Sequence, residues 1–269
     1  MRRAIGRLGT IRVEPLYALG NESKIIVKGR VVESYKQSVP QAGKSYFQNI
    51  LATLRRYAGN SIPEAHVEIS YQGDRHVVES DAEGIIECTI EQAFHREADH
   101  DMVHFRLLPE EGIHPERDYV PYRVTRYSSD HLHGTISDID DTILISHATQ
   151  TGRKFWLSVS KNAYTRRPFP GVSEFYKALN RHGKDPVFYV SSSDWNLYEL
   201  IRDFLNYRKI PPGVLLLKDL HVNLKNIFKS GGASHQHKLE KVELLMDLFP
   251  GMQFVLIGDS GQHDPEIYA

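Results

Sequence analysis

The chain is poor in the residues that mark a secreted or membrane-spanning protein. Its 269 residues include one cysteine, Cys88, so no disulfide can form within the chain and we expect a reducing compartment. No apolar run reaches the length of a membrane span, and no apolar core follows the basic residues Arg2, Arg3 and Arg7. These absences predict a cytoplasmic protein whose membrane contact, where it occurs, is peripheral.

The chain also lacks an excess of charge of either sign. Its 33 Lys and Arg residues nearly balance its 34 Asp and Glu residues. Because no global positive field draws in polyanions, we expect no nucleic-acid partner. An anionic substrate must therefore be held by local groups and a metal ion.

Up to about residue 130, short β-branched runs lie between turn residues. The predicted strands are 24–32, 65–71, 76–79, 85–90, 102–108 and 122–127. Apolar residues at helical spacing predict one helix at 47–57. Strands at this spacing predict a β-sandwich-like accessory domain over residues 1–130. The sequence leaves its ligand or protein partner open.

From residue 131 the predicted strands alternate with helices. The strands are expected at 134–137, 186–191, 212–217 and 254–257. One helix opens at Pro170-Gly171 and has an apolar face made of Val172, Phe175, Tyr176 and Leu179. A second helix is capped by Ser193-Asp194, and a third has Lys238 at its start. This alternation predicts an α/β domain over residues 131–269 with a Rossmann-like, doubly wound parallel sheet. Such a sheet gathers polar groups at its carboxyl edge.

Four polar pieces follow these strands in an order that suits cleavage of a phosphate monoester. The first is Asp138-Ile139-Asp140-Asp141-Thr142. Asp138 can attack phosphorus and form an aspartyl-phosphate. Asp140 can serve as general acid and then as base toward water, and Thr142 can orient its carboxyl group.

The other three pieces supply groups that bind the phosphoryl oxygens and a metal. Ser191 can donate a hydrogen bond to the phosphoryl group, Ser192 and Ser193 are candidate substrate contacts, and Lys238 provides a fixed cation. Close carboxylates need a divalent cation between them. The predicted Mg²⁺ ligands are Asp138, the backbone carbonyl of Asp140, Asp259 and Asp264.

Two histidine pairs, His131-x-His133 and His235-x-His237, raise the alternative of a zinc site. Neither a cysteine cluster nor a His-Glu-x-x-His helix accompanies them. Zinc sites in proteins usually show one of these patterns, so we interpret the pairs as surface histidines.

Longer motifs resemble the haloacid dehalogenase superfamily, and in particular the catalytic domain of the actin-patch phosphatidate phosphatase family. They are Asp138–Ile143, Phe169–Val172, Phe188–Tyr198 and Leu256–Tyr268. The resemblance covers the second half of the chain, and the only departure within these motifs is Asp194, where proline is expected. It implies a Mg²⁺-dependent lipid phosphatase that converts phosphatidate to diacylglycerol. It also implies that the fold continues beyond Ala269.

Two other functions fit the same residues. One is a phosphatase for a soluble or protein-bound phosphomonoester, and the other is a non-catalytic binding or scaffold protein. The basic and aromatic segment Arg153–Leu157 lies where this superfamily places a flap over the site. It could contact an acidic lipid surface, or it could pack against the core.

Overall fold

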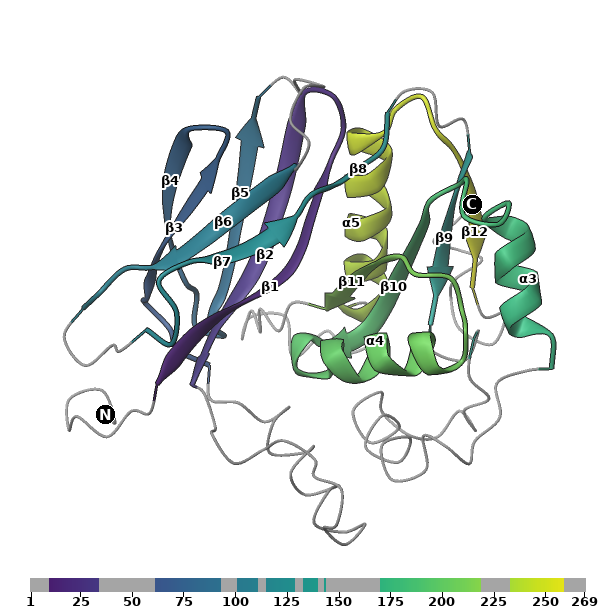
Figure 1. Cartoon of the computed structure of the whole chain (residues 1–269). Helices are drawn as coiled ribbons and strands as arrows, with labels where there is room; N and C mark the ends of the chain where they lie inside the picture. Colours follow the sequence, from purple (N-terminus) through teal and green to yellow (C-terminus); the bar gives the residue numbers. More distant parts are fainter. Residues whose placement is uncertain are drawn as a thin grey trace, which may run out of the picture. The chain divides into compact units, whose positions relative to one another are not determined.

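The computed structural model describes residues 10–33, 61–92, 101–110, 115–128, 133–139, 143, 170–218 and 233–258. The chain divides into two compact units, Met1–Tyr127 and Ser128–Ala269. Together they make a mixed α/β protein with several sheets, richer in strands than in helices (Figure 1). The helix predicted at 47–57 and the flap segment at 153–157 lie outside the described residues.

The described part of the first unit consists of two four-stranded sheets around one hydrophobic core (Figure 1). One sheet has the order β5-β2-β1-β8 and the other the order β4-β3-β6-β7. The strands are β1 Ile11–Gly20, β2 Lys24–Glu33, β3 His66–Tyr71, β4 Asp74–Glu79, β5 Ile85–Glu91, β6 Met102–Leu107, β7 Val120–Arg123 and β8 Thr125–Arg126.

Alternation decides which side chains of the first unit enter its core. In β3, Val67, Ile69 and Tyr71 are buried, whereas the residues between them are partly exposed. Successive side chains of a strand point to opposite faces, so one face of this sheet meets the core and the other meets solvent. Phe105 of β6 is buried in the same core.

Two features of the first unit differ from the sequence prediction. Strand β1, which the sequence did not reveal, pairs with β2 along nearly its whole length, with an irregularity between Pro15 and Tyr17. The strand predicted at 122–127 is divided at Val124: β7 pairs with β6 in one sheet, and β8 pairs with β1 in the other. Hydrogen bonding to partners in both sheets therefore overrides a continuous β-branched run.

The second unit is built on a four-stranded parallel sheet with the order β11-β10-β9-β12. Its strands are β9 His133–Asp138, β10 Val187–Asp194, β11 Val214–Lys218 and β12 Gln253–Ile257. The first strand lies inside the sheet, because the chain adds β10 and β11 on one side and then crosses to add β12 on the other. Ligands of open parallel sheets bind at the carboxyl ends of the strands where the order reverses, which here is beside β9.

Helices α3 Val172–Leu179, α4 Tyr198–Tyr207 and α5 Ala233–Leu248 connect these strands, with a 3₁₀ turn, η2, at Trp195–Leu197 (Figure 1). Right-handed crossovers place α3 and α4 on one face and α5 on the other, because the chain changes direction across the sheet after β11. Gly171 precedes α3 with φ 85°, a conformation that glycine adopts without a steric penalty.

Three local predictions in the second unit were wrong. Ser193-Asp194 does not cap α4, because β10 continues to Asp194 and the cap residue is Leu197. Lys238 is not at the start of its helix, since α5 begins at Ala233. Phe175, predicted to face the core from α3, is 51% exposed.

Candidate active site

Asp138 is the last residue of β9 and lies at the carboxyl edge of the parallel sheet. It pairs in register with Val190 of β10 and is fully buried, with 0% exposure. The preceding residues Thr135 and Ile136 are also buried, as expected of a central strand flanked by helices. The sheet therefore holds a buried carboxylate at its edge.

Lys238 supplies the opposite charge. Its Nζ atom lies 3.2 Å from Oδ2 of Asp138, and its side chain is 2% exposed. Because α5 carries this lysine to β9, two residues distant in sequence form a buried ion pair. Removing two charges from water is unfavourable, and their attraction compensates fully only with good geometry and further hydrogen bonds. A buried charge pair at the carboxyl edge of a parallel sheet is therefore a candidate functional site.

Three serines follow at the end of β10. Ser191 and Ser193 are buried, at 0% and 2% exposure, and Ser192 is half-buried. The backbone N–H of Ser193 donates a hydrogen bond of 3.0 Å to Oγ of Ser191. Among the described residues, the Ser193 hydroxyl has no hydrogen-bond partner. A buried hydroxyl usually has a partner, so Ser193 is a candidate for binding a ligand.

Ser137 and Tyr176 are two residues of this region that the sequence analysis did not assign to the site. Ser137 donates a hydrogen bond of 2.9 Å to the backbone oxygen of Asp138, and its Oγ also contacts the hydroxyl of Tyr176. Burial raises the pKa of Tyr176 to about 12, and the nearby Asp138 carboxylate acts in the same direction. The sequence showed Tyr176 only as part of the predicted apolar face of α3.

Four predicted site residues lie outside the described residues: Asp140, Thr142, Asp259 and Asp264. Strand β12 ends beside β9, with Ile257 in register with Ser137, and Asp259 follows two residues later in the sequence. Within the described ranges, no three His, Cys, Asp or Glu side chains come together as a metal site. The convergence of all predicted residues at one edge stays a prediction.

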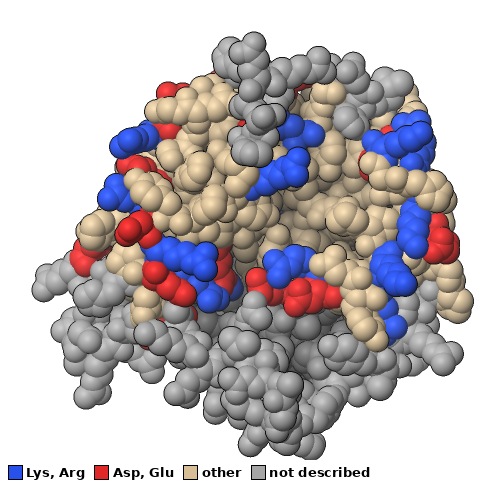
Figure 2. All heavy atoms as spheres, viewed as in Figure 1, with Lys and Arg blue, Asp and Glu red and all other residues tan. Residues whose placement is uncertain are grey.

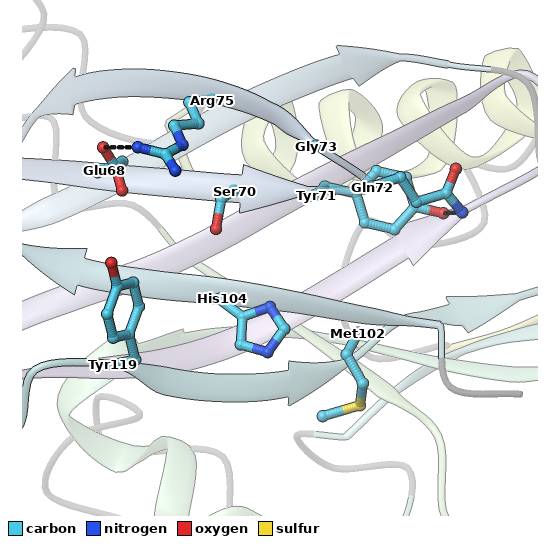
Figure 3. A pocket seen from close by; sticks show the side chains of 9 residues that line it. All are labelled: Glu68, Ser70, Tyr71, Gln72, Gly73, Arg75, Met102, His104 and Tyr119. Atoms are coloured by element: carbon cyan, nitrogen blue, oxygen red, sulfur yellow. Dashed lines mark hydrogen bonds and ion pairs between the residues drawn. The ribbon is translucent and has the colours of Figure 1, made fainter. Parts of the chain in front are cut away.

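The first unit contains a separate cavity of about 330 Å³ on the solvent face of the β4-β3-β6-β7 sheet. Figure 3 shows Ser70, His104 and Tyr119 beside this space, with Arg75 directed toward Glu68 at its border. The Arg75–Glu68 distance is 3.9 Å, so the charged lining residues balance each other. The lining favours neither an anion nor a cation.

On the face drawn in Figure 2, acidic and basic side chains lie interspersed among neutral residues. In the described part of the chain, no helix is both long and apolar enough to cross a membrane.

Two of the solved structures that match this chain have low TM-scores. One is a Ca²⁺-stabilised adhesin with which an Antarctic bacterium binds ice; it is 12% identical to this chain and has a TM-score of 0.25. The aligned region covers 51% of this chain and 30% of the adhesin. A carbohydrate acetylesterase from Xanthomonas citri is 10% identical, covers 91% of this chain and 68% of its own, and has a TM-score of 0.26. Scores this low assign the chain to neither fold.

Two yeast proteins are similar in sequence to about half of this chain. Phosphatidate phosphatase APP1 of Saccharomyces cerevisiae is 32% identical over 142 residues, which are 53% of this chain and 24% of that protein. An uncharacterised protein of Schizosaccharomyces pombe is 28% identical over 136 residues, 50% of this chain and 22% of that protein. The chain thus spans about a quarter of the length of these relatives. The family described as the catalytic domain of phosphatidate phosphatase APP1 matches residues 133–269, from the first residue of β9 onward, and the chain belongs to this family.

Proposed function

We propose that this protein is a phosphatidate phosphatase that hydrolyses the phosphomonoester through an aspartyl-phosphate. The observation that carries the proposal is the buried pair of Asp138 and Lys238 at the carboxyl edge of the parallel sheet. Both residues lie within the segment that matches the catalytic-domain family. The similarity to the Saccharomyces cerevisiae phosphatidate phosphatase supports the choice of substrate.

The proposed reaction has two steps, as in phosphatases of the haloacid dehalogenase superfamily. An oxygen of the Asp138 carboxylate attacks phosphorus, the phosphorus–oxygen bond to diacylglycerol breaks, and Asp140 gives its proton to the leaving oxygen. Asp140 then takes a proton from water as the water oxygen attacks phosphorus, and the bond to Asp138 breaks to release phosphate. In our assignment, Thr142 orients Asp140.

The remaining groups would hold the phosphoryl oxygens. Lys238 already lies 3.2 Å from the Asp138 carboxylate, so its charge would offset the anion that approaches the nucleophile. Ser191 accepts a hydrogen bond from the N–H of Ser193, and we assign its hydroxyl to donate to a phosphoryl oxygen. The buried Ser193 hydroxyl, without a partner in the described part of the chain, would gain one from a phosphate oxygen. Ser192 is assigned as a further substrate contact.

The assigned ligands are oxygen atoms, which would suit magnesium. The Asp138 carboxylate is buried at the sheet edge, and hard oxygen ligands of this kind suit Mg²⁺. We assign Asp138, Asp140, Asp259 and Asp264 as the residues that would hold it. When bound, it would supply positive charge to the phosphoryl oxygens and reduce repulsion between the carboxylates.

The two units would then have different functions. We assign residues 131–269 to catalysis in a Rossmann-like phosphatase domain and residues 1–130 to an accessory domain. We also propose a cytoplasmic location, with peripheral contact to the membrane that holds the lipid substrate. The single cysteine, Cys88, fits a reducing compartment.

The test compares the two leading aspartates. Wild type, Asp138→Asn and Asp140→Asn are given phosphatidate in mixed micelles and, separately, a soluble ester with a very acidic leaving alcohol. We expect wild type to release phosphate from the lipid, Asp138→Asn to form no phosphoenzyme, and Asp140→Asn to accumulate it from the soluble ester. For the lipid, loss of the proton donor in Asp140→Asn should lower turnover by about a hundred- to ten-thousand-fold.

The other outcomes separate the alternatives. Labelling that persists in Asp138→Asn would show that another residue is the nucleophile. Phosphate release from soluble esters but not from phosphatidate would support a different substrate class. No turnover of either substrate by wild type would favour the non-catalytic function.

A further inference from the structure

A chain of hydrogen bonds reaches the main chain of Asp138 from the face of the sheet opposite Lys238. Successive side chains of a strand point to opposite faces, so Ser137 and Asp138 diverge. Lys238 of α5 contacts the Asp138 carboxylate, whereas Tyr176 of α3 contacts Ser137. The residue at the centre of the proposed site is therefore held from both faces.

The direction of the hydrogen bonds follows from the number of protons. A serine hydroxyl has one proton, and Ser137 uses it to donate to the backbone oxygen of Asp138. Tyr176 must then donate its own proton to the Ser137 oxygen. Burial raises the pKa of Tyr176 to about 12, so Tyr176 keeps this proton across the neutral range. The two hydrogen bonds therefore run in one direction. The Tyr176 hydroxyl donates to Ser137 Oγ, and the Ser137 hydroxyl donates to the backbone carbonyl oxygen of Asp138.

Packing alone does not require these hydroxyls. Ser137 is 0% exposed and Tyr176 is 1% exposed, so alanine and phenylalanine would occupy the same positions without any need for polar partners. A fully satisfied polar network in a buried site contributes rigidity and a single geometry. Here the network ends on the carbonyl of Asp138, where small displacements alter the direction of the carboxylate.

We propose that Tyr176, acting through Ser137, is a positioning residue that fixes the main chain of Asp138 so that its carboxylate is aligned for attack. This inference rests on the proposed function, because it concerns the same nucleophile. Neither hydroxyl touches the substrate in this arrangement, and both act through Asp138. A misplacement of about 1 Å at a reacting group can lower the rate by about a hundred-fold, so the hydroxyls should affect kcat more than KM.

The chain offers a matched control for Tyr176. Tyr189 is also fully buried, and its ring centroid lies 6.0 Å from that of Tyr176. Its hydroxyl donates to the carbonyl oxygen of Pro211 at 2.8 Å, away from Asp138. Tyr176→Phe and Tyr189→Phe therefore each delete one buried, hydrogen-bonded hydroxyl and keep the ring. Similar decreases in melting temperature are expected for both.

The experiment measures kcat, KM, the rate of phosphoenzyme formation and the melting temperature of the full chain. Tyr176→Phe should lower kcat and the rate of phosphoenzyme formation by about ten- to a hundred-fold with little change in KM, and Tyr189→Phe should leave all three near wild type. Ser137→Ala should match Tyr176→Phe, and the double variant should lose no more than either single variant, because both interrupt one chain.

Each other result decides against the inference. Equal losses of kcat in Tyr176→Phe and Tyr189→Phe would mean that both hydroxyls act only through packing. Losses in Tyr176→Phe and Ser137→Ala that multiply in the double variant would mean independent roles. Wild-type kcat in Tyr176→Phe would overturn the positioning role alone. A wild-type chain without turnover would overturn the proposed function first, and the inference with it.

Discussion

The two units both bury a positive charge, but they do so in different ways. In the first unit, Lys28 is 2% exposed and lies 2.7 Å from Glu87, whose side chain is 46% exposed. In the second, the side chains of Lys238 and Asp138 are 2% and 0% exposed. In the first unit, one side chain of the pair is exposed to solvent. In the second unit, both side chains of the pair are buried.

This difference bears on what each pair does. When one side chain of an ion pair stays exposed to water, less solvation energy is lost on folding. Such a pair needs no explanation beyond a structural role. A pair that is wholly buried at the edge of a parallel sheet is a poor source of stability, and its placement is better explained by chemistry. The predictions below test this contrast, from the largest expected effect to the smallest.

Removal of divalent cations should have the largest effect on activity. This effect should concern only the reaction that we assign to the second unit. We expect an excess of chelator to abolish phosphate release, because the carboxylates that we assign to the metal site together with Asp138 would no longer be neutralised. Added Mg²⁺ should restore turnover, and added Zn²⁺ should not. The assay is phosphate release before and after chelation, and full activity in excess chelator would contradict the assignment.

Loss of the lysine in each pair should separate chemistry from structure. Lys238→Met removes the cation beside Asp138, and we expect kcat to fall by about a hundred- to a thousand-fold, as for the loss of one preorganised electrostatic group. Lys28→Met removes an equally buried lysine from the first unit and should leave kcat unchanged. Steady-state kinetics of the two variants, each checked for folding, make the comparison. Equal losses of kcat in Lys238→Met and Lys28→Met would contradict the proposed difference between the two ion pairs.

The smallest effect concerns stability and pH. The side chain of Glu14 is 17% exposed. Its partial burial raises its pKa, but Arg30 and Arg12 outweigh this effect and hold the pKa below its ordinary value of 4.5. A lowered pKa means that Glu14 stabilises the fold above pH 4.5 and that this contribution is lost as pH falls through the folded-state value. Glu14→Gln should therefore reduce the free energy of unfolding by about 3 kcal/mol at neutral pH, and by less in acid.

Urea unfolding of wild type and Glu14→Gln at neutral and acidic pH measures this difference. Glu87→Gln is the control, because Glu87 is half-exposed and its loss should destabilise the fold less. Neither variant should change kcat. A stability difference for Glu14→Gln that grows in acid would mean that the sign of the pKa shift is wrong.

Patterns in the sequence located most strands and helices of the second unit. The runs predicted at 134–137 and 254–257 lie within β9 and β12, and the helix expected after Pro170-Gly171 is α3. These segments are flanked by turn residues and have one dominant period, so local information suffices. The ends of elements were less predictable: Ser193-Asp194 has the composition of a helix cap, but pairing with β11 extends β10 to Asp194.

The first unit shows where local patterns fail. Strand β1 contains Pro15 and a pairing irregularity, so its sequence gives no clean alternation, and its partner β2 defines it. The run at 122–127 looks continuous, yet the Val124 N–H bonds to Asp101 and the residues on its two sides join different sheets. Pairing between distant segments decided both cases.

The sequence by itself determined the chemistry that this chain can offer. The order of Asp138, Ser191 and Lys238, each on or after a predicted element, was enough to predict a phosphatase-like site and the residues in it. The tertiary structure decided which groups meet. Only the crossing of α5 to β9 makes Lys238 and Asp138 a buried pair, and only the packing of α3 links Tyr176 to Ser137. The reason is physical: a sequence pattern reports the local preference of a residue, whereas burial, charge pairing and hydrogen-bond direction depend on neighbours that folding brings from elsewhere.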